Sequence, residues 1–112
     1  MTVEELKNAC SLRILAGSET ALQRVVSGCY IGDLLSWAMS RAGENEAWIT
    51  VMGNVNAIAV AVLADCACII LCDDAPLDED ARMRAVQQDV AVLKSDERAF
   101  ALALRLGALF KK

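Results

Sequence analysis

The feature that most constrains the fold is an unbroken apolar run in the second half of the chain, residues 67–72, which reads ACIILC. A strand that is apolar at every position, and not only at every second one, is typical of strands buried on both faces. Such strands occur in parallel sheets that helices cover on both sides. The run therefore predicts a buried strand of an α/β sheet.

Strand and helix patterns alternate along the rest of the sequence. From residue 33 on, helices and strands follow one another with loops of a few residues, which is the order produced by right-handed βαβ crossovers. We therefore expect an α/β fold, with three layers (α/β/α) and a mainly parallel sheet, in a single domain that spans residues 1–112. Strand patterns occupy residues 12–15, 24–31, 47–52, 67–72 and 90–93, and helical patterns occupy residues 3–9, 33–41, 54–64, 78–88 and the stretch after Ser95.

Three of these helices carry start signals. Thr2, followed three residues later by Glu5, is a capping box for the first helix. Asn54 can cap the helix over residues 54–64, which is apolar nearly all round and so belongs in a crowded interior or an interface. Ser95, with acidic residues directly after it, is expected to cap the last helix.

Composition excludes several classes of function. A chain of 112 residues that is 56% apolar and 23% charged supplies one buried core and has no room for a second domain. It contains no His, which removes the usual general base near neutral pH and the commonest ligand of transition metals. Ser–His and Cys–His nucleophiles are excluded with it, as are most familiar hydrolase mechanisms, and we assign no catalytic residue.

Charge and hydropathy restrict the partners. The net charge is −4, and the basic residues are scattered singly apart from the Lys111–Lys112 pair, so we expect no nucleic-acid partner. The longest apolar run, residues 57–64, is far shorter than the roughly 20 residues of a membrane-spanning helix, so we expect no membrane partner. The first residues are acidic where a secretion signal would be basic, which indicates a cytoplasmic protein.

Five cysteines, at positions 10, 29, 66, 68 and 72, do not form the framework of a small secreted protein, and we expect reduced thiols. Cys66, Cys68 and Cys72 fall at even spacing, so on an extended strand they would point to one face. The α-carbons of Cys68 and Cys72 would then lie roughly 13 Å apart, too far for one zinc ion or one disulfide. Core packing is the favoured interpretation, and a redox role is the alternative.

The loops that follow the predicted strands are the places where a ligand would bind, because ligands of open parallel sheets lie beyond the carboxyl ends of the strands. Residues 28–33 and 53–56 offer glycines, backbone amides and helix amino termini that could hold an anion. Gly28 and Gly32 match neither the dinucleotide fingerprint nor the P-loop. Carboxylates on the same edge, such as Asp33, would repel a bare phosphate unless Mg²⁺ intervened. Helix first turns explain the other acidic residues, so we expect no metal site.

Three stretches of the sequence carry a family resemblance. They are VVSGCYIGDLLS at residues 25–36, WIT at residues 48–50 and NAIAVAV at residues 56–62. With the strand at 69–71 and the terminal helix, they resemble the DRTGG domain over nearly the whole chain. Such domains occur alone in anaerobic bacteria and archaea, beside CBS domains or in some phosphotransacetylases, and they resemble the amino-terminal domain of HPr kinase. The resemblance implies a non-catalytic regulatory or ligand-sensing α/β module that forms dimers and whose ligand is poorly defined.

The sequence departs from the family pattern at two places. The five-letter signature is not contiguous, because the corresponding stretch keeps only Arg24 and Gly28. Family members often carry a His in the loop after the Thr-containing strand, where Asn54 stands here. A family ligand that used this His would be bound differently by this chain.

These observations lead to one main hypothesis and two alternatives. The main hypothesis is a regulatory homodimer that binds a small anionic or nucleotide-like ligand, with no cofactor assigned. The first alternative is a protein-binding subunit that uses the apolar helix at 54–64, Trp37 and Trp48 as an interface. The second is a thiol-based redox accessory protein. The residues assigned to the ligand site are Gly28, Gly32, Asp33, Thr50, Asn54 and Asn56.

Overall fold

The computed structural model describes residues 1–110. Its helices and strands lie close to most of the expected segments. They are, in chain order, α1 (Val3–Ala9), β1 (Arg13–Ala16), α2 (Glu19–Leu22), β2 (Gly28–Ile31), α3 (Leu35–Arg41), β3 (Glu46–Thr50), α4 (Val55–Ala64), β4 (Cys68–Leu71), α5 (Glu79–Gln88), β5 (Val92–Lys94) and α6 (Ala99–Phe110).

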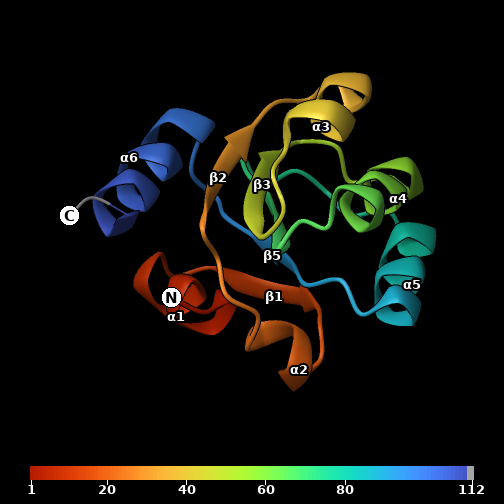
Figure 1. Ribbon diagram of the computed structural model, residues 1–112, viewed down its shortest axis with the longest axis horizontal. Coiled ribbons are helices and arrows are strands. Elements are labelled where there is room, and N and C mark those ends of the chain that lie inside the picture. Colours follow the sequence, from red (N-terminus) through yellow and green to blue (C-terminus); the bar gives the residue numbers. More distant parts are fainter. Residues whose placement is uncertain (111–112) are drawn as a thin grey trace.

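The strands form one five-stranded sheet in the order β1-β5-β4-β3-β2 (Figure 1). The pairs β2–β3, β3–β4 and β4–β5 are parallel, whereas β1 runs antiparallel to β5 at one edge. This arrangement confirms the α/β fold with a mainly parallel sheet.

Helices cover both faces of the sheet, which confirms the three layers. Figure 1 shows α3, α4 and α5 on one side of the sheet and α1 and α6 on the other. The two hydrophobic clusters divide in the same way, because one contains side chains of α3, α4 and α5 and the other contains side chains of α1, α2 and α6. Each step from β2 to β5 moves to the next strand in the same direction, so right-handed crossovers place α3, α4 and α5 on one face.

The apolar run that dominates the sequence forms the centre of this core. All four residues of β4 are buried, as the unbroken apolar pattern predicts. On the neighbouring strand, Trp48 is fully buried and its indole Nε1 donates a hydrogen bond of 2.9 Å to the carbonyl oxygen of Gly32. Among the described residues, no buried side-chain nitrogen or oxygen lacks a hydrogen-bond partner.

Local signals account for two helix starts. Thr2 and Glu5 form the expected capping box, with both reciprocal hydrogen bonds present. Asn54 caps α4 by accepting a hydrogen bond of 2.9 Å from the amide of Ala57.

None of the helices in residues 1–110 is both long enough and apolar enough to cross a membrane.

The first third of the chain differs from expectation in two places. The strand expected at 24–31 is regular only from Gly28. Before Gly28 the chain pairs with the residue that precedes α1, because Val25 forms an isolated bridge with Thr2. The short helix α2 was not predicted. Its signal is Ser18, whose side chain accepts a hydrogen bond from the amide of Ala21, but four residues carry too little periodicity to indicate a helix.

Two further helix starts also differ from expectation. Ser95 does not cap the last helix, since its hydroxyl accepts from the amide of Glu97 and α6 begins only at Ala99. The intervening residues carry the chain from β5 to the opposite face of the sheet. The helix expected from residue 33 begins at Leu35, because Asp33 makes its hydrogen bonds to the next strand and not to its own helix.

A close backbone approach at Gly53 yields the first prediction. A Cβ atom at Gly53 would overlap the carbonyl oxygen of Pro76, whereas a Cβ atom at Gly28 would meet only the end of the Glu46 side chain, at 3.2 Å. We expect Gly53→Ala to lower the free energy of unfolding by about 2 kcal/mol, because backbone must move. Gly28→Ala is the control, with a change within about 1 kcal/mol. Urea unfolding measures both, and equal stability of the two variants would contradict this packing.

Candidate functional site

The expected site lies at the carboxyl edge of the sheet, where β2 and β3 end. The carboxylate oxygen Oδ1 of Asp33 accepts two hydrogen bonds from the end of β3, one of 2.7 Å from the hydroxyl of Thr50 and one of 2.9 Å from the amide of Val51. The parallel register, in which Ile31 lies opposite Ile49, brings these residues together. The side chain of Asp33 therefore joins the loop after β2 to the loop after β3.

Thr50 is the buried member of this group. It is only 1% exposed, and its hydroxyl both donates to Asp33 and accepts a hydrogen bond of 3.2 Å from the amide of Met52. The hydroxyl is thus occupied within the protein, so Thr50 positions the loop and is not free to contact a ligand. Asp33 is exposed, and both of its hydrogen bonds in the described residues are made by Oδ1, which leaves its second carboxylate oxygen without a partner there.

The second loop contributes the start of α4. Asn54 is occupied as the cap of that helix, and Asn56 in the first turn is exposed. The first amides of a helix have no partner inside the helix, so this terminus can accept an anion or a carbonyl group. The groups without a hydrogen-bond partner in the described residues are the second carboxylate oxygen of Asp33, the side chain of Asn56 and the backbone amides of residues 55 and 56, since the amide of Ala57 donates to Asn54.

The two glycines of the expected site have different positions. Gly32 lies beside Asp33, and a Cβ atom there would be 3.0 Å from the hydroxyl oxygen of Tyr30, so the phenol covers this part of the backbone. Gly28 lies apart from Gly32 and Asp33, because it begins β2 and pairs with Glu46 at the amino edge of the sheet. Three strand residues lie between Gly28 and Gly32 at the carboxyl edge, and the two α-carbons are roughly 13 Å apart.

The other half of the carboxyl edge is closed by the protein itself. Backbone hydrogen bonds join the loops after β4 and β5, from the amide of Asp73 to the oxygen of Glu97 and from the amide of Asp74 to the oxygen of Ser95. Their polar groups therefore satisfy one another. Among the described residues, no group of three or more potential metal-ligating side chains is close enough to hold a metal ion.

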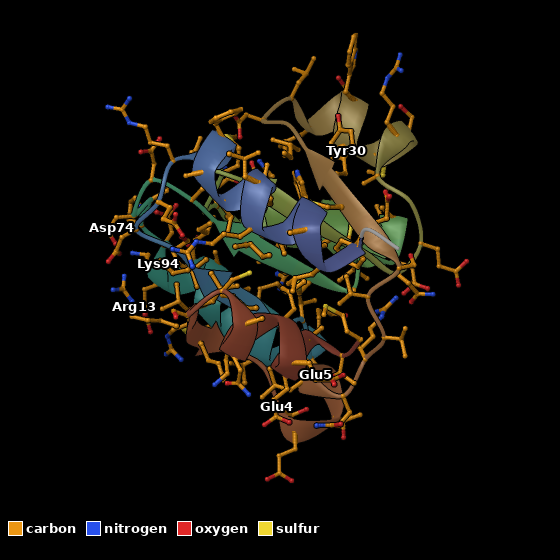
Figure 2. All side chains as sticks on the ribbon, turned by 90° about the vertical axis from the view of Figure 1, so that its left-hand side faces the viewer. Glu4, Glu5, Arg13, Tyr30, Asp74 and Lys94 are labelled. Carbon is orange, nitrogen blue, oxygen red and sulfur yellow. The ribbon has the colours of Figure 1, made fainter. Side chains whose placement is uncertain are left out.

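Basic residues at this edge are paired with carboxylates (Figure 2). Asp74 lies 3.3 Å from the amine of Lys94 and 3.0 Å from the guanidinium of Arg13, which also contacts Asp96 at 3.1 Å. Lys94, by its hydrogen bond and its charge, and then Arg13 hold the pKa of Asp74 below its usual range. Sequence reasoning missed this cluster because Arg13 reaches it only through the antiparallel pairing of β1 with β5.

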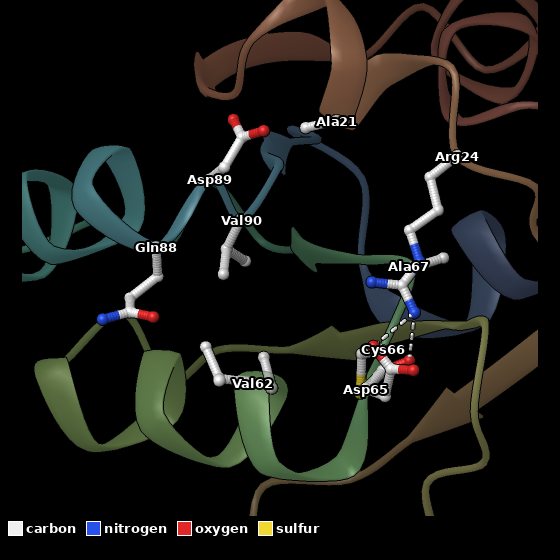
Figure 3. A pocket seen from close by; sticks show the side chains of 10 residues that line it. Ala21, Arg24, Val62, Asp65, Cys66, Ala67, Gln88, Asp89 and Val90 are labelled. Carbon is white, nitrogen blue, oxygen red and sulfur yellow. Dashed lines mark hydrogen bonds and ion pairs between the residues drawn. The ribbon is translucent and has the colours of Figure 1, made fainter.

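A small pocket opens at the opposite edge of the sheet (Figure 3). It has a volume of about 120 Å³ and is lined by residues of α2, α4 and α5. Arg24 closes one side, with its guanidinium 2.7 Å from the carboxylate of Asp65 and 2.6 Å from the backbone oxygen of the same residue. This volume is smaller than that of typical ligand sites, so we assign no ligand to the pocket. The hydrogen bonds of Arg24 to Asp65 hold the end of α4 in place and so stabilise the fold.

The five thiols are protonated and mostly buried. Burial is the main cause that raises the pKa of each one, to about 12 for Cys29 and about 11 for Cys66. The expectation that Cys66, Cys68 and Cys72 share one face is wrong, because β4 begins only at Cys68. Cys66 packs with the helices α3, α4 and α5, and the other two pack on the opposite side.

The fold and the loops at its carboxyl edge define an α/β domain of the kind that carries binding loops on a parallel sheet. The family model of the DRTGG domain matches residues 5–109, and the chain belongs to this family. No curated protein matches the sequence.

Solved structures support the same fold. One similar structure is described as the CBS and DRTGG domains of the regulatory region of Clostridium perfringens pyrophosphatase complexed with its activator, diadenosine tetraphosphate. It matches with a TM-score of 0.71 and 11% sequence identity over 94% of this chain. The match covers 45% of the other chain, so this protein spans less than half of that regulatory region.

The hydrogen bond between Thr50 and Asp33 can be tested by a double-mutant cycle. We expect Thr50→Val and Asp33→Ala each to lower the free energy of unfolding by about 1 to 2 kcal/mol, because each leaves a backbone amide or a polar side chain without its partner. The double variant should lose about 1 kcal/mol less than the sum of the single variants. Urea unfolding of the four proteins gives the coupling, and strict additivity would show that the two side chains do not interact.

Thiol accessibility gives a third prediction. We expect an aromatic disulfide reagent at pH 8 to modify the folded protein slowly, with Cys29 reacting first because it alone is partly exposed. In denaturant all five thiols should react at once. Mass spectrometry of peptides identifies the modified positions. Rapid modification of Cys66, Cys68 or Cys72 in the folded protein would contradict this prediction and support the redox hypothesis.

Proposed function

We propose that this protein is a non-catalytic regulatory module that senses a small anionic or nucleotide-like ligand and acts as a homodimer. The observation that carries the proposal is the match of the DRTGG family model to residues 5–109, nearly the whole chain. The similar structure is part of a regulatory region in complex with a dinucleotide activator, which supports a nucleotide as the first ligand class to test. We further propose a cytoplasmic location.

The proposed ligand site lies between the loop after β2 and the start of α4. The second carboxylate oxygen of Asp33 suits a sugar hydroxyl or a base amine, and the exposed side-chain amide of Asn56 suits a carbonyl or a phosphate oxygen. Amides of the first turn of α4 suit a phosphate group. Because Arg13 and Lys94 at the same edge of the sheet lie on β1 and β5 and are paired with Asp74, phosphate charge would be balanced by these amides and by Mg²⁺ carried with the ligand.

Exposed apolar side chains favour protein binding as a second candidate function. On the outer faces of α4 and α5, Leu63 is 70% exposed and Val86 is 57% exposed. Trp37 is also half exposed and carries the guanidinium of Arg41 over its ring, 4.2 Å from the ring centroid. Trp48 cannot anchor such an interface, because it is fully buried in the core.

Ligand titration tests the main proposal. With Mg²⁺ present, we expect calorimetry to detect binding of diadenosine tetraphosphate or of a simpler adenine nucleotide. Asn56→Ala and Asp33→Ala should weaken this binding by about tenfold or more, since Asn56→Ala removes a direct polar contact and Asp33→Ala removes both a contact and the hydrogen bonds that join the two loops. Asn8→Ala is the matched control, because Asn8 is exposed on α1.

Two outcomes would contradict this proposal. Equal affinity of Asn56→Ala, Asp33→Ala and Asn8→Ala would remove the site assignment and leave ligand sensing to another surface. Absence of binding across AMP, ADP, ATP and diadenosine tetraphosphate, at about millimolar concentrations, would remove the nucleotide class. Circular dichroism of each variant checks that the fold is retained.

A further inference from the structure

Helix α6 carries apolar residues on two faces. Leu102 and Leu106 are buried against the sheet, as expected for a helix that covers a core. On the other side, Phe100 is 76% exposed and Leu104 is 61% exposed. A helix that covers a single core is normally polar on its outer face, so a single copy of this fold does not account for these two side chains.

The exposed apolar residues form a regular stripe. Phe100, Ala103, Leu104, Gly107 and Ala108 follow the spacing i, i+3, i+4, i+7 and i+8, which is the spacing of helix-to-helix contacts. They line a shallow hollow of about 290 Å³, and every lining residue is apolar or glycine. We call these five residues the α6 stripe.

Gly107 gives an independent observation. Glycine destabilises the interior of a helix relative to alanine. Here the backbone does not require it, because Gly107 is not among the residues of positive φ, and a Cβ atom at this position would meet nothing within 4 Å. Within one copy, there is therefore no steric reason for a glycine and not a larger residue at position 107. The close approach of another backbone would supply one.

We propose that the α6 stripe is the contact between two copies of this chain, with the two α6 helices packed antiparallel about a twofold axis. The inference rests on the homodimer of the proposed function and names its surface. The large residues Phe100 and Leu104 lie in the first half of the stripe, and the small residues Gly107 and Ala108 lie in the second half.

The distribution of side-chain sizes determines the orientation. Antiparallel packing sets Phe100 of each copy against the small residues Gly107 and Ala108 of the other and places Leu104 near the axis. Parallel packing would instead oppose Phe100 to Phe100 and leave a void at Gly107. A surface that carries both the projection and the matching hollow is self-complementary, as a twofold contact requires.

The surface beside α6 can extend this contact. A stable dimer buries about 800 Å² on each copy, more than one helix stripe supplies. Figure 1 shows the start of α6 beside the carboxyl end of β2. There Ile31 is 47% exposed and points to the α6 side of the sheet, two residues after Cys29, which packs on that face.

Sedimentation at concentrations from about 1 to about 100 µM tests the proposal. We expect a dimer for the natural chain. Leu104→Asp and Gly107→Leu should each raise the dissociation constant of the dimer by about tenfold or more. Leucine is a better helix former than glycine, so Gly107→Leu should keep or raise the midpoint of thermal unfolding while it blocks the close approach. Met83→Asp, on the exposed face of α5, is the control and should remain dimeric.

The other outcomes overturn the proposal in distinguishable ways. A dimer that survives Leu104→Asp and Gly107→Leu would place the contact elsewhere, and dissociation by Met83→Asp alone would move it to α5. A monomer at every concentration would exclude a second copy on the α6 stripe. Nucleotide titration of the same proteins is scored separately, so a failed dimer contact is not confused with a failed ligand site.

Discussion

Burial of β4 on both faces is the constraint on which the rest of the structure depends. Because Ile69 and Ile70 point to opposite sides of the sheet and are both buried, helices must cover both faces. Three crossover helices cover one face, since β2 to β5 follow one another in a single direction. The other face needs helices from the two ends of the chain, which is why α6 turns away from the crossovers after β5 and packs with α1.

The sequence allowed most of this fold to be predicted because its signals are local. Apolar runs, the capping box of Thr2 and the cap at Asn54 depend on neighbours within a few residues. The wrong predictions concern segments whose structure is determined by contacts with residues distant in the sequence. Residues 24–27 have strand composition, but the bridge between Val25 and Thr2 ties them to the amino terminus. Ser95 has the features of a helix cap, yet the chain must first cross the sheet before α6 can begin.

The site could be predicted in part for the same reason. Parallel strands end at one edge, so the loops that carry Asp33, Thr50 and Asn56 lie at the same edge of the sheet, and there Thr50 donates a hydrogen bond to Asp33. Which atoms remain free could not be predicted, because the occupation of Thr50 by Asp33 and Met52 depends on loop geometry. The position of Gly28 on its strand could not be predicted for a different reason. A strand of four residues has two ends, and composition does not tell which end a glycine occupies.

The direction of the crossovers also decides where a ligand can lie. In open α/β sheets the usual crevice forms where successive loops leave the sheet toward opposite faces. Here that happens after β4 and β5, but backbone hydrogen bonds from Asp73 and Asp74 close that crevice. The end of β2 is not part of these hydrogen bonds. There Asp33 lies two residues from Ile31, which is half exposed on the face of the sheet that α6 covers. A ligand that contacts Asp33 and a second copy that contacts Ile31 would thus act on the same short segment. If the dimer binds the ligand more tightly than the monomer does, linkage requires that the ligand also strengthen the dimer. The two affinities change by the same factor.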